Sequence, residues 1–141
     1  REYLDFYAEA MFRSLGPRIM RMKADVLLPV PVHPSRMKTR GFNQAQELAV
    51  RLSEKLGIPV NSTILRRSKK TAPQKSLDPS GRLKNLEQAF MADHLPPYIH
   101  SVILVDDIYT TGSTIEACTR ILKKAGIERV YFITIFIGNG Q

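Results

Sequence analysis

Val102-Ile-Leu-Val-Asp-Asp-Ile-Tyr-Thr-Thr-Gly-Ser-Thr114 is the stretch that decides the fold of this 141-residue chain. Its four apolar residues, 102–105, predict a buried strand, and two adjacent carboxylates, Asp106 and Asp107, follow at the strand's C-terminal edge. A short loop with hydroxyl side chains and a glycine comes next, and a helical pattern begins after it. Such a turn places the carboxylates beside the positive end of a helix, where ribose hydroxyls and a phosphate can both be bound. The stretch therefore predicts a ribose-phosphate site.

The loop itself has two interpretations. Ser113-Thr-Ile-Glu116 is a capping box that any helix can use. The adjacent carboxylates favour a binding site, because two acids at the edge of a buried strand repel one another and need solvent or a bound group. Gly112 supplies either a positive φ or room for close approach of an oxyanion. The loop contains neither GxGxxG nor GxxxxGK[ST], the two better-known phosphate-binding patterns.

The thirteen residues together resemble the signature of the type I phosphoribosyltransferases, which bind 5-phosphoribosyl-1-pyrophosphate (PRPP). The resemblance implies that Asp106 and Asp107 contact the ribose hydroxyls and that Mg²⁺ is bound with PRPP rather than held directly by the protein. It also implies that the loop holds the 5′-phosphate through Thr110, Thr111, Gly112, Ser113 and Thr114.

Charge is distributed unevenly along the chain. The net charge is +8, and residues 34–84 carry 12 basic and 3 acidic residues, so this segment contributes 12 − 3 = +9 and the remainder 9 − 10 = −1. Such a segment suits a polyanion, either a pyrophosphate or a nucleic-acid backbone. The single cysteine, Cys118, excludes an internal disulfide and a cysteine-cluster zinc site within these residues. No apolar run reaches the length of a membrane span and no secretory signal is present, so the cytoplasm is the expected compartment.

Hydrophobic spacing predicts strands that alternate with helices. Strands are expected over 26–30, 99–105 and 129–137, with one or two short strands in 58–65. Helices are expected over 2–15, 17–22, 45–56 and 115–125, and residues 66–82 are expected to form a long mobile loop. This alternation predicts a single α/β domain, 1–141, with a mainly parallel sheet, helices on both faces, and ligands at the C-terminal ends of the strands. The phosphoribosyltransferase resemblance implies the same Rossmann-like arrangement.

Two basic loops match places where the same family makes its other contacts. The loop after the first strand corresponds in position to the pyrophosphate loop, which makes Ser35 and Arg36 the candidates for that group. The long loop resembles the catalytic loop of the glutamine-dependent amidophosphoribosyltransferases and contributes Lys75, Arg82 and Lys84 as candidates. No side chain is identified as a catalytic acid, base or nucleophile.

Several motifs in a fixed order resemble the ComF family of bacterial competence proteins: LPVPVH-PSR, RGFNQ, the PQK-x6-R-x2-N loop and LVDDIYTTGST. The match runs from about residue 26 to the end. It implies a role in the uptake of transforming DNA, with single-stranded DNA and a competence helicase as candidate partners. Members of this family typically carry an upstream four-cysteine zinc module. These residues contain no such module, so it is expected before Arg1 or is missing.

Three hypotheses about function remain open at this point. The first is an active phosphoribosyltransferase in nucleotide metabolism or salvage, with an unidentified acceptor. The second is a PRPP-fold adaptor in DNA uptake whose basic segment binds single-stranded DNA through Arg66, Arg67, Lys69 and Lys70. The third is a PRPP sensor that does not turn its ligand over.

Overall fold

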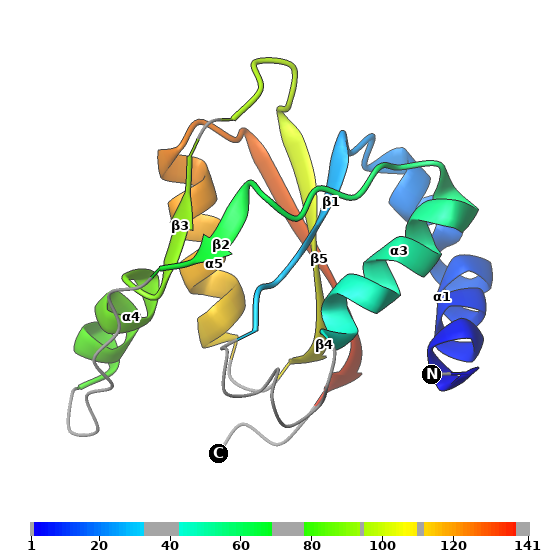
Figure 1. The fold of residues 1–141 in the computed structure, drawn as a ribbon, viewed down its shortest axis with the longest axis horizontal. Helices are drawn as coiled ribbons and strands as arrows, with labels where there is room; N and C mark the ends of the chain where they lie inside the picture. The colour runs from blue at the N-terminus through cyan, green and yellow to red at the C-terminus, as the bar shows by residue number, and fades with distance from the viewer. Residues whose placement is uncertain (1, 33–42, 69–77, 94, 110–111, 138–141) are drawn as a thin grey trace.

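The structure is a computed structural model that describes residues 2–32, 43–68, 78–93, 95–109 and 112–137. The described residues form two sheets and four helices, shown in Figure 1. In chain order the elements are α1 (Glu2–Arg21), β1 (Val26–Pro29), α3 (Gln44–Leu56), β2 (Leu65–Arg67), α4 (Pro79–Glu87), β3 (Phe90–Ala92), β4 (Ser101–Tyr109), α5 (Ser113–Lys124) and β5 (Arg129–Ile137).

Strand β4 lies at the centre of a three-stranded parallel sheet with the order β1-β4-β5. Val102 of β4 pairs with Val26 of β1 on one side and with Val130 of β5 on the other. Parallel neighbours cannot be joined by a tight hairpin, and α5 provides the crossover between β4 and β5. The short strands β2 and β3 form a separate antiparallel pair. The expected α/β architecture with a parallel main sheet is therefore confirmed.

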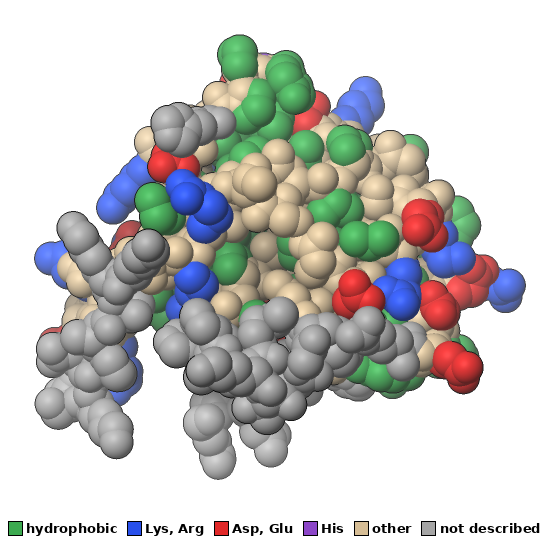
Figure 2. Space-filling view, in the orientation of Figure 1, with side chains coloured by type: hydrophobic (Ala, Val, Ile, Leu, Met, Phe, Trp, Pro, Cys, Tyr) green, Lys and Arg blue, Asp and Glu red, His purple; other side chains and the backbone are tan. Residues whose placement is uncertain are grey.

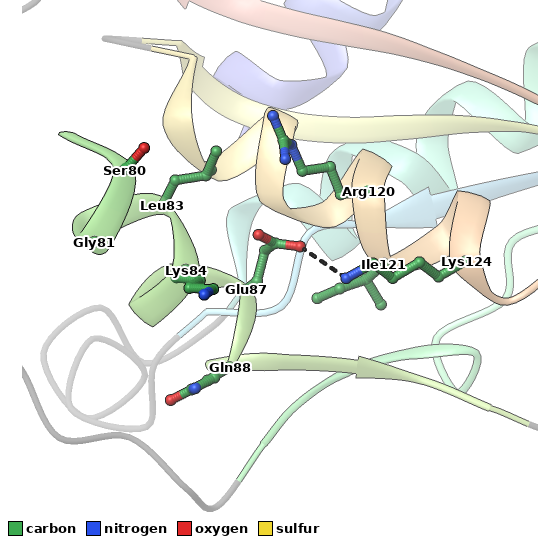
Figure 3. Close-up of a pocket in the computed structure, with 9 residues that line it drawn as sticks. All are labelled: Ser80, Gly81, Leu83, Lys84, Glu87, Gln88, Arg120, Ile121 and Lys124. Carbon is green, nitrogen blue, oxygen red and sulfur yellow. Dashed lines mark ion pairs between the residues drawn. The ribbon is translucent and has the colours of Figure 1, made fainter.

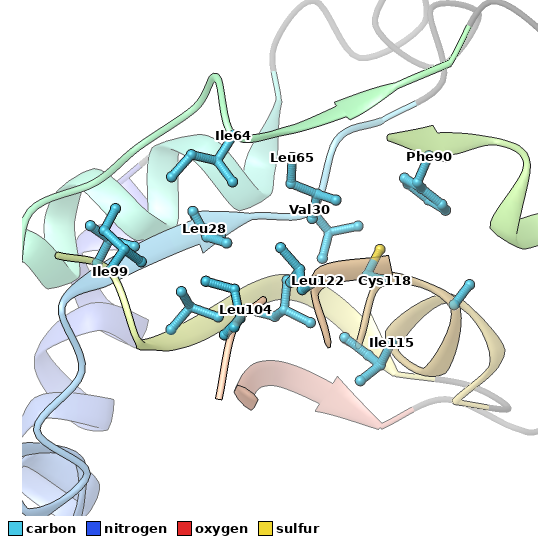
Figure 4. Close-up of a cluster of buried hydrophobic side chains, with 14 of the residues drawn as sticks. Leu28, Val30, Ile64, Leu65, Phe90, Ile99, Leu104, Ile115, Cys118 and Leu122 are labelled. Carbon is cyan, nitrogen blue, oxygen red and sulfur yellow. The ribbon is translucent and has the colours of Figure 1, made fainter. Parts of the chain in front are cut away.

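Alternate residues of the central strands enter two separate cores. Leu28 and Leu104 pack on the face covered by α5 and the β2–β3 pair, together with Leu122 and Cys118 (Figure 4). The intervening residues, such as Ile103, pack on the opposite face against α1 and α3. Figure 1 shows the same division, with α1 and α3 on one side of the sheet and α5 on the other. Both faces of β4 are buried, which explains its uninterrupted apolar run.

Helix α1 differs from the prediction, because it continues through Gly16 and Pro17 to Arg21 instead of ending before them. A proline inside a helix removes one hydrogen bond and costs about 3 kcal/mol. Packing on both sides of the proline offsets that cost, since Met11 before it and Ile19 after it are both buried in the same core. The expected pair of helices is therefore one helix.

The segment 66–82 also differs from the prediction of one long loop. Its first residues complete β2, and its last residues begin α4. Asp78 caps this helix by accepting a hydrogen bond from the Gly81 backbone N–H at 2.7 Å, and Pro79 occupies the first turn, where its missing N–H has little cost. Leu83 and Leu86 then pack against the core. The Asp-Pro start and the spacing of these leucines are the sequence signals that the loop prediction missed.

In the folded chain, several basic residues of segment 34–84 pair with acidic residues from outside it. Arg51 and Lys55 of α3 pair with Asp5 and Glu9 of α1, the first pair at 2.8 Å. Arg66 pairs with Asp93, just after β3. In Figure 2, acidic and basic side chains lie next to one another over α1 and α3. The segment is therefore less available to a polyanion than its sequence charge indicates, because acids that lie outside it in sequence neutralise part of it.

Candidate ribose-phosphate site

The two acids lie within strand β4 rather than after it. The ladder with β5 continues past them, pairing Asp106 with Thr134 and Tyr109 with Ile137. Asp106 is half-buried and Asp107 is 9% exposed. Because successive strand residues point to opposite faces, Asp106 lies on the α5 side of the sheet and Asp107 on the side of α1 and α3. The strand prediction ended at Val105 because the sequence pattern shows only the apolar part of the strand.

A backbone hydrogen bond links the two acids. The Asp107 N–H donates to Oδ1 of Asp106 at 2.9 Å. This bond occupies one acceptor site of the Asp106 carboxylate and orients it along the strand. A carboxylate has about four lone-pair sites, so acceptor capacity is left for hydroxyl groups of a ligand.

Helix α5 begins at Ser113, shortly after the acids in the chain. Gly112 precedes it with φ 82°, in the left-handed region that favours glycine, so the expectation of a positive φ at this residue is confirmed. The helix starts at Ser113, and its first backbone bond runs from the Glu116 N–H to the Gly112 carbonyl at 2.9 Å. The Glu116 side chain pairs with Arg120 at 3.0 Å. Ser113 is thus the first helical residue and not the cap, so the capping-box interpretation is wrong.

The start of α5 is suited to an anion. The first N–H groups of a helix have no partner within the helix, and the helix dipole adds positive potential at that end. Ser113 is exposed and Thr114 is half-buried beside these groups. Thr110 and Thr111, the other predicted phosphate residues, lie outside the described residues. The described part of the site therefore contains two carboxylates and a helix start joined by a left-handed glycine.

Arg67 lies on the same side of the sheet as Asp106. Its guanidinium carbon is 4.6 Å from the centre of the Phe90 ring, its cross-strand partner. Asp106 and Arg67 both act electrostatically on the buried thiol of Cys118, which places the three groups near one another. Arg67 is half-buried. The sequence placed it among nucleic-acid contacts, and its stacking on Phe90 could not be predicted because the two residues are brought together only by strand pairing.

The thiol of Cys118 is fully buried, as the sequence predicted from its place on the apolar face of the helix. Burial raises the pKa of the Cys118 thiol to about 12, and the nearby Asp106 carboxylate raises it further than Arg67 lowers it. A neutral, inaccessible thiol is a poor nucleophile. Cys118 is therefore a core residue that supports the α5 side of the site.

The other predicted residues are divided between described and undescribed segments. Arg82 and Lys84 lie on α4, where both are exposed, so they belong to a helix and not to a loop. Arg66 is exposed and paired with Asp93. Ser35, Arg36, Lys69, Lys70 and Lys75 lie outside the described residues.

Among the described residues, no group of three or more His, Cys, Asp or Glu side chains is arranged to hold a metal ion. In the same part of the chain, no helix is both long enough and apolar enough to cross a membrane.

Comparison with known proteins identifies the protein family to which this chain belongs. The family described as "Phosphoribosyl transferase domain" matches residues 37–141. This chain belongs to that family. A purine phosphoribosyltransferase from Pyrococcus horikoshii has a similar fold, with a TM-score of 0.57 and 18% identity over 94% of this chain and 73% of that chain.

Relatives found by sequence similarity narrow the family further than the fold does. Competence protein F of Haemophilus influenzae is 38% identical over 109 residues, which cover 75% of this chain and 47% of the relative. Competence protein ComFC of Streptococcus pneumoniae is 30% identical over 127 residues, which cover 89% of this chain and 54% of the relative. These matches confirm the resemblance to the ComF family. The chain spans about half the length of these relatives.

Proposed function

We propose that this chain is a PRPP-binding, phosphoribosyltransferase-like domain that serves in the handling of DNA during natural transformation. The observation that carries the PRPP site is the position of Asp106 and Asp107 near the C-terminal end of β4, shortly before α5 begins at Ser113. The family match over residues 37–141 supports the ligand class. The names of the competence relatives support the process.

In this proposal the ligand lies across the C-terminal end of the sheet. The carboxylates of Asp106 and Asp107 accept hydrogen bonds from the ribose hydroxyls, and the first turn of α5 binds the 5′-phosphate through its N–H groups and the Ser113 and Thr114 hydroxyls. Arg67 adds a positive charge near Asp106. This assignment explains why two acids are kept at a strand position that is more than half buried.

Magnesium fits this site only as a partner of the ligand. Carboxylate oxygens are suitable donors for Mg²⁺, which commonly binds one or two carboxylates together with substrate phosphates. In this proposal the ion would be held by the ligand, and Asp106 and Asp107 would bind the ribose hydroxyls beside it. When bound, the ion would neutralise charge on the pyrophosphate of PRPP.

Isothermal titration with PRPP and Mg²⁺ tests the site. We expect Asp106→Asn or Asp107→Asn to weaken PRPP binding about tenfold or more, because hydrogen bonds to charged groups contribute about 1.5–3 kcal/mol. Asp93→Asn, at a half-buried acid just after β3 that pairs with Arg66, is the matched control and should leave the affinity unchanged. Wild-type protein that fails to bind PRPP at millimolar concentration would exclude the proposed ligand. Release of pyrophosphate with candidate acceptors, measured separately, distinguishes an enzyme from a sensor.

A further inference from the structure

A groove separates α4 from α5 on the outer side of the molecule, and no residue predicted for PRPP lines it apart from Lys84. Its volume is about 790 Å³. Figure 3 shows side chains from both helices converging on it. The lining residues are Ser80, Gly81, Leu83, Lys84, Glu87, Gln88, Arg120, Ile121 and Lys124.

The groove is elongated. On α4 it extends from Ser80 to Gln88, which corresponds to about 12 Å along a helix axis. On α5 it uses residues 120–124, in the C-terminal half of the helix, whereas the candidate ribose-phosphate site lies at the opposite end. A length of two helical turns suits a segment of polymer better than a single compact anion.

The chemistry of the lining is both apolar and basic. Leu83 and Ile121 are half-buried and pack against the core, so they offer apolar surface within the groove. Lys84, Arg120 and Lys124 supply three positive charges against the single negative charge of Glu87. An incoming segment should therefore carry both apolar and acidic side chains.

Two of these cations already have acidic partners. Lys124 is 79% exposed and its Nζ is 3.6 Å from Glu87, whose side chain is 14% exposed. Arg120 pairs with Glu116 one turn earlier, and both side chains are about half exposed. An exposed pair such as Arg120–Glu116 contributes little to stability, so Arg120 can exchange its partner at low cost. Lys84 is exposed at the surface of α4.

We propose that the α4–α5 groove docks an acidic amphipathic helix of a protein partner. Apolar side chains spaced at i and i+4 would contact Leu83 and Ile121, and acidic side chains beside them would pair with Lys84, Arg120 and Lys124. A nucleic-acid strand fits less well, because the lining has no aromatic side chain for base stacking and its apolar surface would face a phosphate backbone. The proposal does not depend on PRPP binding.

Selection from a displayed library of random twelve-residue peptides, without PRPP, tests the groove. We expect selected peptides to combine acidic residues with an apolar i, i+4 pair. Binding measured by fluorescence anisotropy should weaken about tenfold in Lys84→Ala/Arg120→Ala, which loses two such pairs. Arg18→Ala/Arg21→Ala removes the same charge from exposed positions on α1 and should change binding less than about twofold.

Three results would overturn the proposal: no peptide is selected, the selected peptides bind both double variants equally, or a short oligothymidylate displaces them and binds the groove more tightly. The last result would assign the groove to nucleic acid. All four substituted residues are exposed, and matching thermal melts of both variants would show that folding is intact.

Discussion

At the scale of single residues, Cys118 shows how burial decides what a reactive group can do. The residue is fully buried among apolar side chains, and the pKa of its thiol rises from 9.0 to about 12. In the unfolded chain the same thiol loses its proton near its ordinary pKa. The folded state therefore binds one more proton than the unfolded state between these two values, and stability must fall as pH rises through that window.

We predict that Cys118→Ala is less stable than wild type at pH 8 and that this difference shrinks by about 1.4 kcal/mol at pH 10. The change arises because only the wild-type chain has the thiol to titrate. Urea unfolding at both pH values measures it, and the comparison cancels the lysines and tyrosines that the two proteins share. A stability difference that does not change with pH would show that folding does not raise the pKa of the Cys118 thiol.

Asp25 is a second residue whose environment fixes its charge. Its carboxylate accepts hydrogen bonds from the backbone N–H groups of His100 and Ser101, which lower its pKa below the ordinary 3.8. The same contacts connect the residue before β1 to the start of β4. They therefore set the alignment of the two strands that lead to the candidate site.

Asp25→Ala is expected to lower the free energy of unfolding by about 1.5–3 kcal/mol at pH 7, because two backbone donors lose a charged acceptor. A depressed pKa contributes stability above the unfolded value and loses it as pH falls. The cost of the substitution should therefore decrease below about pH 4. Urea titrations at pH 7 and pH 3 provide the measurement, with Glu54→Ala as the control at an exposed acid on α3. An equal cost at both pH values would contradict this role for the charge.

At the scale of elements, the helices end and continue for identifiable reasons. Gly57 closes α3 with φ 74°, and its N–H donates to the Ser53 carbonyl at 2.8 Å. Gly16 lies inside α1 instead, where an added Cβ would be 3.5 Å from Cδ1 of Phe12, an ordinary van der Waals distance. The position of Gly57 therefore needs a residue without a side chain, whereas the position of Gly16 can accept a methyl group.

Gly57→Ala should destabilise the protein by about 1 kcal/mol, because alanine is strained at positive φ. Gly16→Ala should stabilise it by about 0.5–1 kcal/mol, because alanine is the better helix former at a position that has room for a methyl group. Thermal unfolding of the two variants against wild type gives both signs at once. Destabilisation by both would mean that α1 is packed too tightly at Gly16 for any side chain.

At the scale of the whole molecule, the two sides of the sheet differ in how their charged residues are arranged. The α1–α3 face pairs its own charges, whereas the α5 face contains Asp106, Arg67 and the α4–α5 groove. The proposed PRPP site lies at the end of β4, where the two faces meet. Binding there would connect β4 to α5 and so should stabilise the fold as a unit.

PRPP with Mg²⁺ should raise the melting temperature of the protein. At a ligand concentration a hundred times Kd, mass action adds about 2.7 kcal/mol, or roughly 8 °C for a domain of this size. Differential scanning fluorimetry measures the shift, and ribose 5-phosphate at equal concentration should give a smaller one because it lacks the pyrophosphate. Equal shifts for the two ligands would indicate that the pyrophosphate makes no contact.

Much of this architecture follows from local patterns. The apolar run before Asp106 predicted β4, and the spacing of Leu48 and Leu52 predicted α3. A positive φ was one of the two roles expected of Gly112, and the structure has it. Patterns of this kind involve residues close together in sequence. The hydrophobic periodicity of a helix or strand, and the glycine that ends a helix, can therefore be recognised directly. The missed features were the continuity of α1, the start of α4 and the extension of β4 past its acids. In α1 and β4, contacts with distant elements override the local signal.

The sequence by itself determined the fold class and the family, because the patterns that specify them can be recognised in short stretches of the chain. It also predicted where a ribose phosphate would bind. Tertiary structure alone decided which charges remain available. It paired Arg51 with Asp5, placed Arg67 over Phe90 and brought Lys84 of α4 and Arg120 of α5 to the same groove. The physical reason is that electrostatic contacts depend on distance in space, and residues far apart in the chain become neighbours only when the cores on both faces of β4 are packed.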